Sequence, residues 1–85
     1  MIRNELLEIL VCPENHTRLA RADGELIRRV NEAVAGGRLR TRSGARVEER
    51  LDEGLVREDG AVLYAVRDGI PVMLVDEAIP LDQLR

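Results

Sequence analysis

Two turn signals divide the second half of the chain into short apolar runs, and this spacing restricts the fold more than any other feature. The stretch "GLVREDGAVLYAV" (54–66) has apolar runs on both sides of 58–60, and "VRDGIPVMLV" (66–75) repeats the arrangement around 68–69. Asp-Gly pairs tolerate the positive φ that tight hairpin turns need. The pattern predicts two successive β-hairpins, with the last strand at 72–75.

The stretch "ADGELIRRVNEAVAGG" (22–37) predicts an amphipathic helix over 23–36. Its apolar residues recur at helical spacing and form one stripe. Asp23 is the expected N-cap, and Gly36 and Gly37 supply the stop. A shorter run, "NELLEIL" (4–10), predicts one or two further helical turns before Pro13. Helical segments beside a small antiparallel sheet predict an α+β fold.

The remaining segments have less regular apolar patterns and predict no helix or strand clearly. The polar stretch "RLRTRSGARVEERLDEG" (38–54) predicts a loop or irregular hairpin, and the tail (76–85) is expected to be extended and docked through Ile79 and Leu81. With 85 residues, one Tyr and neither Phe nor Trp, the core must be thin and aliphatic. We expect a single domain, 1–85.

Charge and cysteine content exclude several classes of protein. The net charge is −3, from 16 acidic and 13 basic residues, which is not typical of a dedicated nucleic-acid-binding protein. One Cys cannot form an intramolecular disulfide, and no stretch approaches the roughly 18 apolar residues of a membrane span. The N-terminus does not have the pattern of a signal peptide. We therefore expect a cytoplasmic protein with no membrane contact.

The segment "CPENH" (12–16) looks like half of a zinc site. A structural zinc needs four ligands, and the chain offers Cys12 and His16 as its single Cys and single His. We therefore expect no metal, with Cys12 as a buried core residue and His16 as an exposed turn residue. The same pair lacks a third orienting group for nucleophilic catalysis, so the sequence predicts neither an enzyme, a cofactor nor a small-molecule substrate.

Arginines alternate in "RLRTRSGAR" (38–46). If that stretch is extended, its first three arginines share one face and could contact phosphates, with a fourth nearby. A solvated loop balanced by the acidic residues that follow is the other interpretation, and no aromatic residue is available there for base stacking. The possible RNA contacts are Arg38, Arg40, Arg42 and Arg46.

The run "VMLV" (72–75) is apolar on both faces of its predicted strand. We expect Val72 and Leu74 to face the core and Met73 and Val75 to face outward, either under a helix or against another protein. Pro71 lacks an N–H, which places this strand at an edge. The predicted partner-binding residues are Ile70, Pro71, Met73 and Val75.

The stretches "LLEILVCP" (6–13) and "YAVRDGIPVMLVDEA" (64–78) together resemble the Trm-one-one-two family, small zinc-ribbon-like proteins that activate methyltransferases and include short bacterial proteins of the YcaR type. Cys12-Pro13, Tyr64 and the run 67–74 match the family pattern, which covers 5–19 and 55–78. Ala65 replaces the usual Pro. The other three ligand positions hold Asn15, Arg57 and Gly60.

The resemblance implies a zinc-ribbon-like sheet without metal and a non-catalytic role. It also implies a core from 5–19 and 55–78, with a helical insertion over about 20–54. Relatives of this kind join their sheet to that of a partner. On this reading the chain binds and stabilises an S-adenosylmethionine-dependent methyltransferase acting on tRNA, rRNA or protein, as a heterodimer in which RNA contact is indirect. The alternative is a free-standing small protein that contacts RNA through the arginine stripe.

Overall fold

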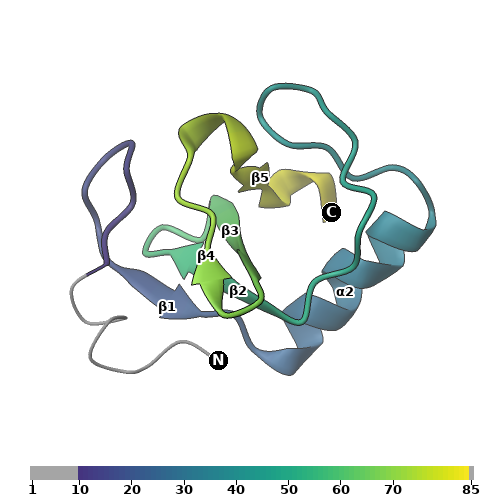
Figure 1. Cartoon of the computed structure of the whole chain (residues 1–85), viewed down its shortest axis with the longest axis horizontal. Coiled ribbons are helices and arrows are strands. Elements are labelled where there is room, and N and C mark those ends of the chain that lie inside the picture. Colours follow the sequence, from purple (N-terminus) through teal and green to yellow (C-terminus); the bar gives the residue numbers. More distant parts are fainter. Residues whose placement is uncertain (1–9, 85) are drawn as a thin grey trace.

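The computed structural model describes residues 10–84 as one helix and a curled antiparallel sheet (Figure 1). This confirms the α+β class. The predicted helical turns over 4–10 lie outside the described residues, apart from Leu10. The elements in chain order are β1 (Leu19–Arg21), α2 (Gly24–Ala35), β2 (Glu53–Arg57), β3 (Val62–Arg67), β4 (Ile70–Pro71), the 3₁₀ turn η1 (Val75–Glu77), β5 (Ile79–Pro80) and the 3₁₀ turn η2 (Leu81–Leu84).

Strand β3 is the centre of the sheet. The order is β1-β2-β3-β4, all antiparallel, and β5 also pairs with β3. The first predicted hairpin is confirmed, because β2 and β3 pair with Leu55 opposite Tyr64. The turn at 68–69 is also confirmed, since Asp68 and Gly69 both have positive φ and Arg67 pairs with Ile70.

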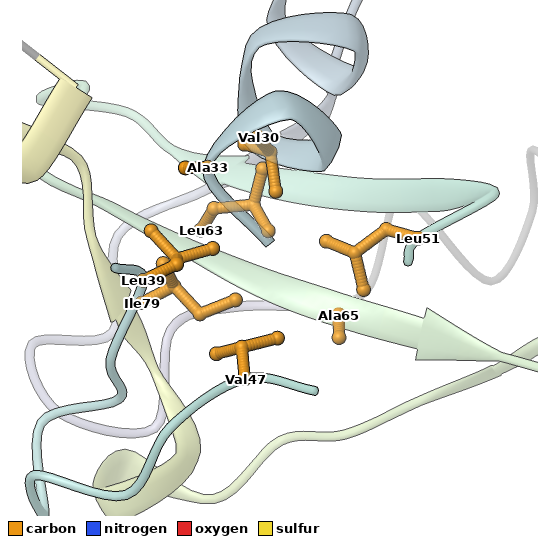
Figure 2. Close-up of a cluster of buried hydrophobic side chains, with 8 residues drawn as sticks. All are labelled: Val30, Ala33, Leu39, Val47, Leu51, Leu63, Ala65 and Ile79. Atoms are coloured by element: carbon orange, nitrogen blue, oxygen red, sulfur yellow. The ribbon is translucent and has the colours of Figure 1, made fainter. Parts of the chain in front are cut away.

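Both faces of β3 are buried, so the sheet has a core on each side. Val62, Tyr64 and Val66 belong to a first cluster that also contains Cys12 and Leu55. The intervening residues belong to a second cluster, which lies between β3, helix α2 and the loop that follows the helix (Figure 2). Its members are Val30, Ala33, Leu39, Val47, Leu51, Leu63, Ala65 and Ile79. The segment 20–54 therefore provides much of this second core.

Helix α2 begins and ends as predicted. The Asp23 carboxylate accepts a hydrogen bond from the Leu26 N–H at 2.8 Å, and Gly37 after the helix has a φ of +69°. The helix buries Val30 and Ala33, and the Asn31 amide is bonded in both directions to the backbone of Leu51. The loop after the helix is thereby fixed to it. Among the described residues, no helix is long and apolar enough to span a membrane.

The predicted strand over 72–75 is wrong. Strand β4 ends at Pro71, and the chain makes one further bond to β3, from the Val72 N–H to the Ala65 carbonyl, before it turns at η1. The reason is that β5 occupies the continuation of this edge, with Ile79 paired opposite Leu63. The tail docks through Ile79, which is 1% exposed, and through the half-buried Leu81.

Candidate functional site: an exposed edge and an ion-pair cluster

Residues 12–17 form a tight turn around the one cysteine. The Cys12 N–H donates to the Thr17 carbonyl and the His16 N–H to the Cys12 carbonyl, both at 2.8 Å. The Asn15 side chain accepts bonds from both the N–H and the hydroxyl of Thr17, while His16 takes a φ of +60°. His16 is exposed, as predicted.

Cys12 is completely buried in the first core cluster, as predicted, but it is also hydrogen-bonded. Its Sγ lies 2.9 Å from the Tyr64 hydroxyl and 3.9 Å from Nη1 of Arg57. Burial alone would raise the pKa of the Cys12 thiol. Bonds from Tyr64, from the backbone N–H groups of Asn15 and Glu14 and from Arg57 together outweigh that effect, so the pKa is lowered. Because no surface of this thiol is exposed, a substrate cannot reach it.

Arg57 connects the 12–17 turn with the turn between β2 and β3. Its Nη1 donates to Glu14 at 2.7 Å, and its Nε and Nη2 bind Asp59 at 2.9 and 2.8 Å. Glu14 also binds Arg42, from the loop after α2. We call Glu14, Arg42, Arg57 and Asp59 the ion-pair cluster. Arg57 is only 8% exposed, so its charge is sequestered by these partners.

The charges of the ion-pair cluster stabilise one another. The pKa of Glu14 is lowered by Arg42 and Arg57. The pKa of Asp59 is lowered by Arg57 and by the Ala61 N–H. In turn, Asp59 is the largest influence that raises the pKa of Arg57. No carboxylate of the cluster is therefore poised as a general base. Within residues 10–84, no group of three His, Cys, Asp or Glu side chains could hold a metal ion.

The ion-pair cluster was not predicted from the sequence. From the sequence, Arg57 was noted only because it stands at a position where the family pattern has a zinc ligand. The available signal was a charged residue at a strand position between apolar neighbours, followed two residues later by an acidic turn residue, Asp59. Its other partner, Glu14, is 43 residues away in sequence, and that pairing depends on the folded sheet.

Two large apolar side chains are strongly exposed where β4 ends. Ile70 is 67% and Leu74 61% exposed. The predicted orientation of this stretch is wrong, because Leu74 points to solvent while Met73 packs against the first core cluster. The regular alternation was expected of a strand, and no strand forms at 72–75. Pro71 and Val75, also predicted for partner binding, are half-buried.

The backbone of residues 70–74, which we call the edge segment, has an open side. In the part of the chain that the structure describes, β4 pairs with β3 alone. The Val72 N–H points to β3, so the next N–H in an extended chain, that of Met73, points away from it. Within residues 10–84, the Met73 N–H has no hydrogen-bond partner. The edge segment therefore combines an open backbone donor with two exposed apolar side chains.

The arginine stripe is partly engaged in internal contacts. Leu39 is fully buried, so its neighbours Arg38 and Arg40 share the solvent side as predicted. The Arg40 guanidinium, however, donates to the Gly44 carbonyl at 2.8 Å, and Arg42 belongs to the ion-pair cluster. Arg46 is exposed and its backbone forms an isolated bridge with Arg40.

Comparison with known proteins identifies relatives over nearly the whole chain. No protein-family model matches. UPF0434 proteins of Rhizobium etli and Maricaulis maris are each 36% identical, covering 93% and 92% of this chain and 84% and 81% of the relatives. A UPF0434 protein of Anaplasma phagocytophilum is 35% identical over 92% of this chain and 72% of its own length.

A solved structure has the same fold. The solution NMR structure of XF2673 from Xylella fastidiosa matches with a TM-score of 0.79 and 26% identity, covering 98% of this chain and 86% of the other. The resemblance to the methyltransferase-activator family was wrong, because the relatives are UPF0434 proteins, which are distinct from that family. Nothing in these matches points to methyltransferase activation or tRNA modification. The two short motifs that suggested the methyltransferase-activator family are weaker evidence of family than similarity over more than nine-tenths of the chain.

Proposed function

The chain belongs to the UPF0434 family, and from that premise we propose that it is a non-catalytic protein-binding domain whose docking site is the edge segment, 70–74. One observation carries the proposal: Ile70 and Leu74 remain more than half exposed in a domain with little apolar material to spare. Exposed large apolar side chains beside an open strand edge are typical of a surface that pairs with another chain. The methyltransferase partner rested on the resemblance alone, so the proposal names no methyltransferase.

Docking would combine side-chain burial with a small number of backbone bonds. Pro71 has no N–H, so the edge offers its carbonyl and the Met73 N–H to an added strand. Covering Ile70 and Leu74 would contribute about 1–2 kcal/mol each from buried apolar area. The side chains therefore supply most of the binding free energy, and the backbone sets the register.

The other candidate functions have weaker support. Catalysis by Cys12 has no support, because its thiol is buried. RNA binding through the arginine stripe has less support, because Arg40 and Arg42 form internal bonds and Glu48 and Glu49 follow closely in the same loop. It stays an alternative prediction, which a salt titration of RNA binding would test.

The finer description of the sheet as zinc-ribbon-like without metal is also a proposal. It is supported by Arg57, which lies between the 12–17 turn and the β2–β3 turn and bonds to groups from both. A guanidinium would then tie together two turns that a ribbon ties with zinc. Elemental analysis of purified protein should show well under one zinc per chain, and stability should not change with EDTA. Stoichiometric zinc would overturn this description.

Site-specific photo-crosslinking in the native host tests the function. A photo-reactive amino acid at position 74 should give a discrete crosslinked complex, because that side chain would lie in the interface. The same probe at Glu25, an exposed residue on α2, is the matched control. Equal crosslinking from both positions, or none from position 74, would contradict a docking site at the edge.

A further inference from the structure

We propose that the partner presents an extended apolar segment with Lys or Arg on both sides of it. This inference rests on the proposed function, because it specifies what the edge segment binds. It comes from the charges around Ile70 and Leu74, which the proposed function does not use.

Carboxylates flank the edge segment at both ends. Asp68 lies two residues before Ile70, and Asp76 lies two residues after Leu74, with Glu77 next to it. All three carboxylates are exposed, and none forms an ion pair or side-chain hydrogen bond with any residue in the described range 10–84. Glu14 and Asp59, by contrast, are neutralised by arginines within the ion-pair cluster.

Among the described residues, no Arg side chain pairs with Asp68, Asp76 or Glu77, the acidic border of the edge segment. No Lys or Arg occurs between 68 and 84. Arg67 is directed to the preceding loop, where it donates to the carbonyls of Arg50 and Glu49 at 2.8 and 3.3 Å. Arg46 and Arg67 line a hollow of about 260 Å³ together with Glu77, but neither pairs with that carboxylate. Asp68 and Asp76 thus remain free for a partner.

The arrangement is symmetric about Val72. Two residues from Val72 on either side there is an exposed apolar residue, Ile70 or Leu74. Two residues further on each side there is a carboxylate, Asp68 or Asp76. Within the edge segment, Ile70 and Leu74 lie on the same face of the chain, and Asp68, in the turn before it, and Asp76, in η1, lie just beyond its two ends. A partner strand with apolar residues at alternate positions and a basic residue at each end would match both features.

Charge also excludes two other occupants. A second copy paired antiparallel about Val72 would place Asp68 opposite Asp76 of its partner, twice, and like charges directly opposite one another destabilise a strand pair. A nucleic acid would bring phosphates close to the carboxylates of Asp68, Asp76 and Glu77, which repel them. The basic-flanked protein segment is the occupant that the charges favour.

Short synthetic peptides measured by fluorescence anisotropy test the inference. The probe has Val at alternate positions, Thr between them and Arg at both ends; the comparison peptide has Glu at both ends. At low salt, we expect the Arg-flanked peptide to bind about tenfold more tightly, and the difference to shrink at high salt. Equal affinities for the two peptides would overturn the inference while leaving the proposed function intact.

Variants of the full chain separate charge from apolar contact. The triple variant Asp68→Asn, Asp76→Asn, Glu77→Gln should bind both peptides alike, whereas Leu74→Asp should bind neither. Glu25→Gln, which removes a carboxylate from α2, should keep the tenfold preference. If no peptide binds but position 74 still crosslinks to a protein in the host, the partner is not a basic-flanked strand. If crosslinking from position 74 also fails, the proposed function fails with it.

Discussion

The ion-pair cluster and the edge segment belong to the same small sheet but treat their side chains in opposite ways. At the turns, one cation is drawn inward and fully bonded: Arg57 is 8% exposed and binds two carboxylates. At the edge, apolar groups are left outside and unpaired, with Ile70 at 67% exposure. The first region holds three chain segments together, whereas the outward side chains of the second, Ile70 and Leu74, contribute little to folding. The contrast separates residues for stability from residues for binding.

Removing the Arg57 side chain should have the largest effect. Arg57→Ala removes the cation that both Glu14 and Asp59 bind and opens a cavity beside Cys12. We expect a loss of about 2–4 kcal/mol in the free energy of unfolding. Urea unfolding followed by circular dichroism measures it, with Arg18→Ala, at an exposed position, as the control. A loss under about 0.5 kcal/mol would show that the cluster does not hold the turns together.

Charging the inward side of the edge segment should cost nearly as much. Met73 packs against the first core cluster, so Met73→Asp forces a carboxylate against apolar side chains. We expect a loss of about 2–3 kcal/mol, measured by thermal and urea unfolding. This reverses the expectation from the sequence, which placed Met73 on the outside. If Met73→Asp is as stable as the unmodified chain, the packing in this segment is not the one described.

The hydroxyl of Tyr64 should contribute less. Tyr64→Phe removes its bond to the Cys12 Sγ and leaves a buried thiol with one partner fewer, so we expect a loss of about 1 kcal/mol. Cys12→Ala should cost about 1–2 kcal/mol through the small cavity. The double variant should lose less than the sum of the two, because both single changes break the same bond. Simple additivity would show that the bond contributes nothing.

Acid should weaken the ion-pair cluster without touching the edge. The folded pKa values of Glu14 and Asp59 are lowered, so their contribution to stability is fully present above the unfolded values of about 4 and is lost as pH falls through the folded values. Unfolding free energy should therefore decline below about pH 4–5. The decline should be shallower in Arg57→Ala, and an unchanged slope in that variant would contradict this assignment.

Much of the fold follows from local sequence rules, and the two regions show where those rules stop. Helix α2 was predictable because Asp23 and Gly36 mark its ends and its apolar stripe is regular. The hairpin turns were predictable from Asp-Gly pairs. The strand at 72–75 was not, because its path depends on β5 having taken the edge of β3 beside Leu63. A local apolar pattern carries no information about that competition.

The edge segment and the ion-pair cluster also differ in how much of each could be predicted from the sequence. The edge position of Pro71 was predictable from sequence, because a proline after a hairpin turn restricts pairing wherever the chain lies. The orientation of Leu74 and Met73 was not, since it required the true path of the chain. The ion-pair cluster joins residues 14, 42, 57 and 59, so it appears only when distant segments are brought together.

The most direct test compares binding and stability in one variant of the edge. The partner captured by crosslinking at position 74 is purified, and its affinity for the unmodified chain and for Leu74→Asp is measured by calorimetry beside urea unfolding. Leu74 is 61% exposed, so the free energy of unfolding should change by less than about 0.5 kcal/mol. The affinity should fall by about a hundredfold or more, because the change places a charge in a dry interface. Retained affinity in a stably folded Leu74→Asp chain would contradict the edge segment as the docking site.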